Sequence, residues 1–215
     1  MIIVNHRVNK LDQLKSNPSK FGCEIDIRNH NDKLYLVHDP YNKNAVVLEK
    51  WLRSYKNKFL ILNVKEEGLD EELIFLMKKF KIKNYFILDE TIPYIFKYAN
   101  LGISDFALRI SEIEHYKSIE VFQNNLRANK KKINWVWIDT FSGNPIKKNI
   151  FIKLKKLSLK TCFVSPELHH QNNREIWIDL INNFSKKLIS NKIKPDMVCT
   201  KLPDKWNKIN KSFIF

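Results

Sequence analysis

The segment FLILNVKEEGLDEELIFLMKKFKIKNYFIL, residues 59–88, contains the pattern on which the fold depends. It begins with an apolar run at Phe59–Val64, continues through the mixed segment Glu71–Phe80 and ends with a second apolar run at Tyr85–Leu88. Continuous apolar runs are typical of strands buried on both faces of a parallel sheet. The middle segment places its apolar residues on one helical face. Residues 59–88 therefore predict a strand–helix–strand unit.

The same alternation extends in both directions over all 215 residues. Eight such units favour closure into a small (β/α)8 TIM barrel, formed by residues 1–215 as a single domain. The absence of GxGxxG and GxxxxGK[ST] sequences counts against the open nucleotide-binding sheets of the α/β class. A further short strand is expected at Leu34–Val37. The eight expected barrel strands are Ile2–Asn5, Cys23–Ile27, Phe59–Val64, Tyr85–Leu88, Asp105–Ile110, Trp135–Ile138, Thr161–Val164 and Met197–Thr200. Helices are expected at Leu11–Leu14, Val46–Tyr55, Glu71–Phe80, Ile92–Tyr98, Ile119–Ala128, Ile150–Leu157 and Ile176–Ile189.

The formal net charge of +15 is the most conspicuous bulk property. The lysines are spread over helix-like segments, which is typical of exposed helix faces. A basic patch interleaved with aromatic residues is not apparent, so we expect no nucleic-acid partner. The charge would still favour encounter with a small anionic substrate. The sequence carries no signal for an oligomeric state.

The three cysteines, Cys23, Cys162 and Cys199, lie within or beside apolar runs and form no CxxC pair. This pattern predicts buried thiols in a reducing compartment. The apolar run in MIIVNHRVNK is too short for a signal peptide, and no apolar stretch approaches the ~18 residues of a membrane span. We therefore expect a cytoplasmic protein without an integral membrane segment.

Polar residues follow the predicted strands, and active sites of such barrels lie at the carboxyl ends of the strands. We therefore expect these side chains to converge on one face of the barrel. The residues concerned are His6 and Arg7, Glu24 and Asp26, His38 and Asp39, Asn63 and Lys65, Asp89 and Glu90, Arg109, Asp139, Glu167 with His169 and His170, and Lys201.

Glu24 and Asp26 lie two residues apart, so on a strand both side chains point the same way. Two carboxylates at a barrel mouth repel each other unless a cation or protons intervene. Oxygen ligands suit a hard divalent ion such as Mg²⁺ or Ca²⁺. The alternative is a pair of solvent-facing acids on an edge strand, which the apolar neighbours Cys23, Ile25 and Ile27 disfavour.

His6 and His38 each follow an apolar run and precede a charged residue. One imidazole can take a proton from an attacking hydroxyl while the second protonates the leaving oxygen. The guanidinium of Arg7 suits a phosphate group, and Lys65 can add positive charge where oxyanion charge develops. These residues predict acid–base chemistry on a phosphate ester.

Three pieces of the sequence resemble the amino-terminal signature of glycerophosphodiester phosphodiesterases. They are His6-Arg7, the segment GCEIDIR at 22–28 and the segment LVHDP at 36–40, where the family has His-Arg, Glu-x-Asp and His-Asp in that order. LNVK at 62–65 resembles the family's Glu-x-Lys strand, and KPDMVCTKLPD at 194–204 resembles its closing strand. The resemblance implies a TIM-barrel phosphodiesterase. It also implies His6 and His38 as general acid and base, Arg7 and Lys65 on the phosphate, and Glu24, Asp26 and Asn63 as ligands of a divalent metal, Mg²⁺ or Ca²⁺.

Two residues depart from the family pattern. Val8 replaces the glycine after His-Arg, and Asn63 replaces the third metal-binding carboxylate. The amide of Asn63 can bind Mg²⁺ or Ca²⁺ but adds no negative charge, so metal affinity should fall. Two other outcomes are a changed metal site in which Glu66, Asp89 or Glu167 compensates, and loss of the metal site.

The expected function is hydrolysis of a soluble glycerophosphodiester-type or related diester by two-histidine catalysis, assisted by a metal. Two alternatives stay open: a lyase that releases a cyclic phosphate, as in sphingomyelinase-D-like members, and a catalytically decayed binding protein on the same barrel. The roles of His169, His170, Glu167 and Arg109 are not assigned by the sequence.

Overall fold

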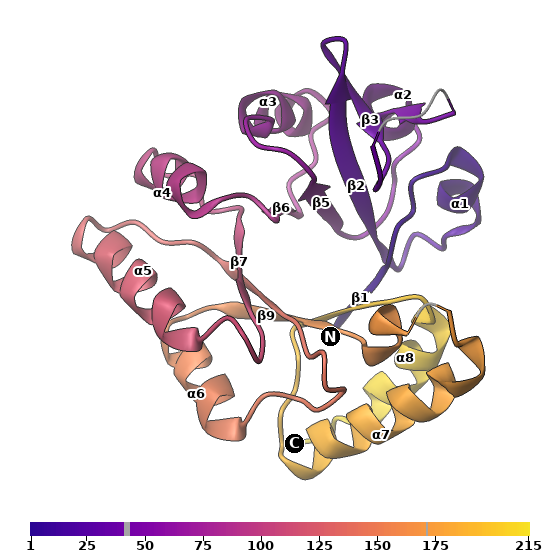
Figure 1. The fold of residues 1–215 in the computed structure, drawn as a ribbon, viewed down its shortest axis with the longest axis vertical. Helices are drawn as coiled ribbons and strands as arrows, with labels where there is room; N and C mark the ends of the chain where they lie inside the picture. The colour runs from indigo at the N-terminus through magenta and orange to yellow at the C-terminus, as the bar shows by residue number, and fades with distance from the viewer. Residues whose placement is uncertain (41–43, 171) are drawn as a thin grey trace.

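The strands form a parallel β-barrel in the computed structural model, which describes residues 1–40, 44–170 and 172–215 (Figure 1). Within these residues each barrel strand pairs in parallel with its neighbour in the order β1, β2, β5, β6, β7, β8, β9, β10. The predicted (β/α)8 TIM barrel is thereby confirmed. The strands are β1 (Ile2–Asn5), β2 (Gly22–His30), β5 (Leu60–Val64), β6 (Tyr85–Leu88), β7 (Ala107–Ile110), β8 (Trp135–Ile138), β9 (Lys160–Val164) and β10 (Met197–Thr200).

Strand pairing is extensive between the first and last strands of the barrel and minimal between β6 and β7. Along β1 and β10 the register runs from Ile2 opposite Met197 to Asn5 opposite Thr200. By contrast, β6 meets the segment before β7 through a single bridge between Ile87 and Phe106. Backbone pairing around the barrel is therefore weakest at the β6–β7 junction.

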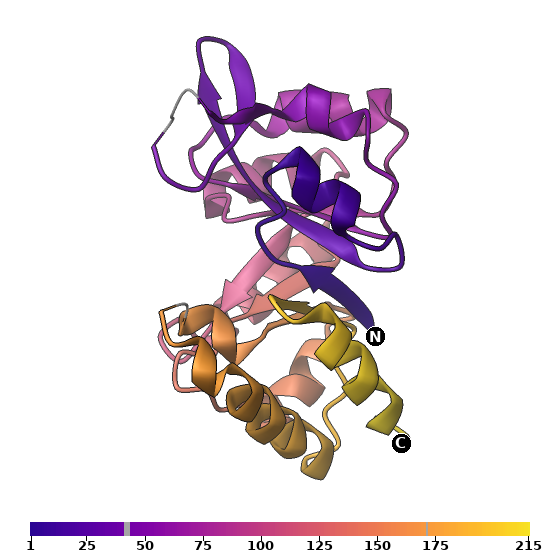
Figure 2. The same cartoon turned by 90° about the vertical axis from the view of Figure 1, so that its right-hand side faces the viewer.

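A hairpin extends β2 beyond the barrel and carries the predicted extra strand (Figure 2). β3 (Lys33–Leu36) pairs antiparallel with β2, and β4 (Val46–Val47) pairs with β3. The connecting residues Asn31 and Asp32 both take positive φ angles, of 48° and 56°. Asparagine and aspartate tolerate this left-handed conformation, which a tight hairpin turn requires.

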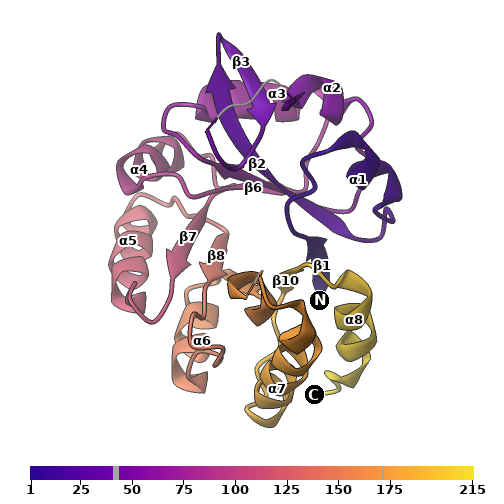
Figure 3. The ribbon, with the colours of Figure 1, turned by 45° about the vertical axis from the view of Figure 1, so that its right-hand side comes forward.

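Helices surround the barrel as an outer layer, and the two chain ends lie near each other (Figure 3). The helix expected at Val46–Tyr55 begins only at Leu48, because Val46 and Val47 pair with β3 instead. The last helix was not expected, although Pro203 at its first turn is a helix-start signal. The helices are α1 (Leu11–Ser16), α2 (Leu48–Leu52), α3 (Asp70–Lys79), α4 (Ile92–Asn100), α5 (Tyr116–Ala128), α6 (Lys148–Lys156), α7 (Trp177–Ser190) and α8 (Pro203–Ile209), with short 3₁₀ turns at Pro166–His169, Arg174–Ile176 and Asn210–Ser212.

The barrel interior is filled by its own apolar cluster, separate from the larger core between strands and helices. Phe59, Phe86 and Trp135 form an aromatic group in which Trp135 lies 5.2 Å from each of the other two rings, centroid to centroid. These bulky side chains occupy the interior, so polar groups can gather only toward the strand ends.

The predicted thiols are confirmed as buried: Cys23, Cys162 and Cys199 are all free and shielded from solvent. Among the described residues, no helix has both the length and the apolar character needed to traverse a bilayer.

Candidate active site

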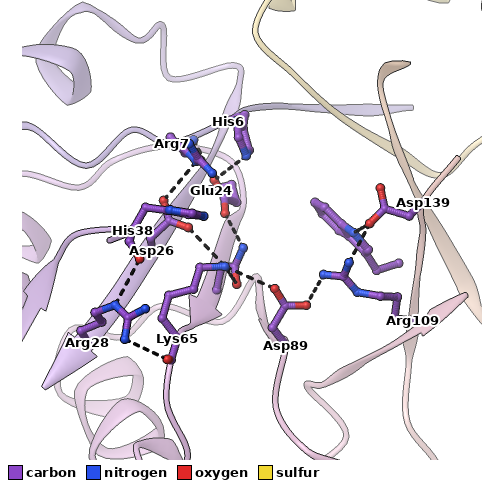
Figure 4. A network of polar contacts seen from close by, with 12 residues as sticks. His6, Arg7, Glu24, Asp26, Arg28, His38, Lys65, Asp89, Arg109 and Asp139 are labelled. Atoms are coloured by element: carbon purple, nitrogen blue, oxygen red, sulfur yellow. Dashed lines mark hydrogen bonds and ion pairs between the residues drawn. The ribbon is translucent and has the colours of Figure 1, made fainter. Parts of the chain in front are cut away.

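Nine of the polar residues predicted to converge are joined in one network at the carboxyl ends of the strands (Figure 4). A continuous series of ion pairs and hydrogen bonds runs from β1 to the end of β8. Its members are His6, Arg7, Glu24, Asp26, Asn63, Lys65, Asp89, Arg109 and Asp139.

Glu24 and Asp26 point into the barrel from β2 and are both completely buried. Their neighbours Cys23, Ile25 and Ile27 face the outer core, as the alternation of a strand requires. The alternative of solvent-facing acids is therefore wrong. Burial, together with the adjacent Glu24, raises the pKa of Asp26.

A sharp turn after β1 brings the backbone onto these carboxylates. Arg7 adopts φ 55°, and its backbone N–H donates to Glu24 Oε2 at 2.7 Å. The guanidinium Nε of Arg7 lies 3.6 Å from Asp26 Oδ2. Asn9, which the sequence did not single out, donates to the same Asp26 oxygen at 2.9 Å and accepts from the Asp26 N–H at 3.0 Å. Val8 is buried in the outer core.

His6 lies at the rim of the barrel interior with 11% of its side chain exposed. Its Nε2 is 3.7 Å from Glu24 Oε2, and its Nδ1 has no hydrogen-bond partner among the described residues. Burial, with Lys201 and Arg7 close by, lowers the pKa of His6 to about 3. The ring is therefore neutral at physiological pH and can accept a proton there.

Lys201 follows β10 and belongs to the same corner of the mouth. Its Nζ donates to the His6 carbonyl at 2.5 Å, and burial lowers its pKa. Sequence position alone marked Lys201 as a strand-end residue. Only the pairing of β10 with β1 brings its ammonium to His6.

His38 stands apart from this buried corner, on the loop after β3. Its side chain is 39% exposed, and its Nδ1 lies 2.9 Å from Asp39 Oδ1. Arg28 Nε donates to the His38 carbonyl at 3.1 Å, which anchors the loop to β2. With Nδ1 occupied by Asp39, Nε2 is the ring nitrogen left for a ligand.

Asn63 on β5 and Lys65, the first residue after β5, connect the carboxylates of β2 to Asp89. Lys65 Nζ donates to Asn63 Oδ1 at 2.6 Å and lies 3.5 Å from Asp26 Oδ1. It also lies 3.3 Å from Asp89 Oδ2. Asn63 Nδ2 in turn donates to Glu24 Oε1 at 2.8 Å.

The donor set does not fit a hard divalent ion. Glu24, Asp26 and Asn63 lie together, but all of their side-chain oxygens except Asp26 Oδ1 accept hydrogen bonds from N–H or ammonium donors of the protein. Mg²⁺ and Ca²⁺ take six or more oxygen ligands at short distances. Over residues 1–40, 44–170 and 172–215, no group of three or more His, Cys, Asp and Glu side chains could hold a metal.

The carboxylates considered as compensating ligands are engaged elsewhere. Glu66 accepts from the Asn29 N–H at 2.7 Å, close to the turn of the hairpin. Asp89 is paired with both Lys65 and Arg109. Glu167 is fully buried and accepts from Thr200 Oγ1 at 2.5 Å.

The same contacts assign structural roles to residues that the sequence left open. Glu167 also accepts from the Ser165 hydroxyl and the Lys201 N–H, so it ties β9 to β10. Arg109 joins Asp89 to Asp139, and His169 Nε2 lies 2.8 Å from Asp139 Oδ1. The carbonyl of His170 accepts from the Trp177 indole at 2.8 Å.

A cavity of about 820 Å³ opens beside this network, next to the weakly paired β6–β7 junction. Asp89 and Arg109 line it on the side of the mouth, and Ile92 and Ile95 of α4 face Ile113 and Ile119 across it. It therefore combines aliphatic walls with a charged rim.

The fold is shared with a solved glycerophosphoryl diester phosphodiesterase from Parabacteroides distasonis ATCC 8503. The two structures superpose with a TM-score of 0.65 at 13% sequence identity, over 100% of this chain and 87% of the other. At this identity the likeness establishes the barrel fold. No protein-family model and no curated protein sequence matches the chain.

Proposed function

We propose that this protein is a phosphodiesterase that cleaves a soluble diester of the glycerophosphodiester type, with His6 and His38 as its acid–base pair. The main support is His6, a neutral imidazole with an unbonded Nδ1 at a mouth lined by cations. The barrel shared with a glycerophosphoryl diester phosphodiesterase supports the same class of reaction at the level of the fold.

The pKa of His6 assigns its role in the first step. The lowered pKa leaves His6 without a proton to give at neutral pH, so we assign it the role of base, and the negative charge of a bound phosphodiester beside the ring would raise its basicity. It takes the proton of an attacking hydroxyl, either water or a hydroxyl next to the ester. The new O–P bond forms as the P–O bond to the leaving alcohol breaks, and His38 protonates that leaving oxygen.

Positive side chains stabilise the charge that develops on the phosphoryl oxygens. Arg7 and Lys65 are the predicted phosphate ligands, and Lys201 adds a third cation beside His6. Fixed cations in a largely buried site are worth more than the same charges in water. The alcohol moiety of the substrate would extend past Asp89 and Arg109 into the adjacent cavity.

The chemistry of the attacking hydroxyl separates the remaining alternatives. Attack by water gives a hydrolase, whereas attack by a neighbouring hydroxyl gives a cyclic phosphate that is either opened by water or released by a lyase. A barrel that binds the diester without cleaving it would be a decayed binding protein. The small-molecule substrate and the cytoplasmic location both remain predictions.

The test is turnover of soluble glycerophosphodiesters by the purified protein, with phosphorus NMR to identify linear and cyclic products. Assays with EDTA and with Mg²⁺, Ca²⁺ or Mn²⁺ keep a metal requirement from hiding activity. We expect His6→Ala and His38→Ala each to lose roughly 100-fold or more in rate.

His30→Ala is the matched control, because His30 is the last residue of β2, four residues beyond Asp26 and opposite Lys33 in the hairpin, and it should keep wild-type turnover. A folded protein that cleaves no diester would refute the proposal. So would equal loss of activity in His30→Ala.

A further inference from the structure

Asn63 links a carboxylate to an ammonium group. Such a link requires a side chain that can donate one hydrogen bond and accept another at the same time. Asn63 Nδ2 donates to Glu24 Oε1 at 2.8 Å, and its Oδ1 accepts from Lys65 Nζ at 2.6 Å. The orientation of the amide is fixed by its neighbours, since the reverse would set oxygen against carboxylate and nitrogen against ammonium. A carboxylate at this position would instead repel Glu24.

Three of the four oxygens of the two buried carboxylates accept a hydrogen bond from the protein, and the fourth, Asp26 Oδ1, has an ion-pair contact but no hydrogen-bond partner among the described residues. Glu24 Oε1 and Oε2 accept from Asn63 and from the Arg7 N–H. Asp26 Oδ2 accepts from Asn9, and Asp26 Oδ1 lies 3.5 Å from Lys65 Nζ. Two buried charges need compensation, and these contacts provide it without an added ion.

We propose that the Lys65 ammonium, which lies near Asp26 and is linked to Glu24 through Asn63, substitutes for a divalent cation at this carboxylate pair, so that the site binds no Mg²⁺ or Ca²⁺. Metal-independent cleavage follows from this where the proposed function holds. Metal binding by the site can be measured whether or not the protein cleaves a diester.

The position of Lys65 supports this role. Its side chain is 15% exposed, and its Nζ lies within 3.5 Å of oxygens from Asn63, Asp26 and Asp89. A divalent ion entering between Glu24 and Asp26 would have to displace the ammonium and break the Asn63–Glu24 hydrogen bond. Like-charge repulsion with Lys65 and Arg7 would oppose its entry.

The experiment compares metal binding by the wild type and by Asn63→Glu, both stripped with EDTA and free of substrate. Mn²⁺ binding is measured by electron paramagnetic resonance, and thermal unfolding is followed with and without Mg²⁺, Ca²⁺ or Mn²⁺. We expect no stoichiometric binding and no shift in Tm for the wild type. Asn63→Glu places a third carboxylate beside Glu24 and Asp26, and it should bind one ion. At about 100 times Kd that ion should raise its Tm by roughly 5–10 °C.

Asn63→Gln is the matched control, because it keeps the amide and should gain no metal binding. One equivalent of Mn²⁺ bound by the wild type and lost in Lys65→Met or Glu24→Gln would overturn the proposal. A folded Asn63→Glu that binds no ion would also overturn it. If Asn63→Glu does not fold, the wild-type titration still decides.

Turnover supplies a separate readout. Where the wild type cleaves a diester, we expect its rate in EDTA to match the rate with added metal to within about twofold. Loss of the rate in EDTA, restored by Mg²⁺ or Ca²⁺, would overturn the proposal. Absence of cleavage under all conditions would refute the proposed function and leave the binding result to stand by itself.

Discussion

Burial of neutral His6 has a measurable consequence for stability in acid. Its pKa is about 3 in the folded protein against an ordinary value of 6.5, so below about pH 6.5 the unfolded chain binds a proton that the folded chain excludes. Stability therefore falls as the pH is lowered. At about 1.4 kcal/mol per pH unit, the loss from this group between roughly pH 7 and pH 5 is about 2 kcal/mol.

Urea unfolding of the wild type and of His6→Gln at both pH values measures this contribution. Carboxyl groups with a raised pKa, such as Asp26, increase stability as the pH falls. They are present in the wild type and in His6→Gln, so the comparison of the two proteins cancels their contribution. The wild type should lose about 2 kcal/mol more than His6→Gln on acidification. Parallel losses in the two proteins would mean that folding does not lower the pKa of His6, and the description of His6 as a buried imidazole that stays neutral in acid would then fail.

Three further predictions concern stability. Burial raises the pKa of Glu90 to about 7, next to the similarly raised Asp70, so Glu90→Gln should stabilise the protein by roughly 1–2 kcal/mol at pH 8 and not at pH 4.5, as measured by urea unfolding. Glu167→Ala should cost roughly 3 kcal/mol or more in the same assay, because it leaves Ser165, Thr200 and the Lys201 N–H without their buried acceptor; a loss under 1 kcal/mol would contradict that role. Gly22→Ala should lower stability by about 1–3 kcal/mol in the same assay, since its Cβ would lie 2.7 Å from the Phe59 carbonyl oxygen; an unchanged free energy of unfolding would contradict this close contact.

Local pattern was sufficient to predict the barrel. Apolar runs at the barrel strands and amphipathic spacing in segments such as 71–80 reflect burial on both faces and on one face, which are properties of neighbouring residues in the chain. Local pattern does not show which segments pair, and for this reason the strand at Val46–Val47 was missed. Val46 and Val47 became a strand because β3 offered a pairing edge, and periodicity within 46–55 contains no information about that edge.

The sequence by itself determined that polar residues gather at the mouth, because parallel strands place all their carboxyl ends on one face. Only the tertiary structure decided which of those residues form hydrogen bonds and ion pairs with one another. Asn63 donates to Glu24 and accepts from Lys65 because β2 and β5 pair with Asp26 opposite Asn63. Lys201 reaches His6 because β10 closes the barrel against β1. Hydrogen-bond partners, burial and therefore pKa values depend on distances across the barrel, which spacing along the chain does not specify.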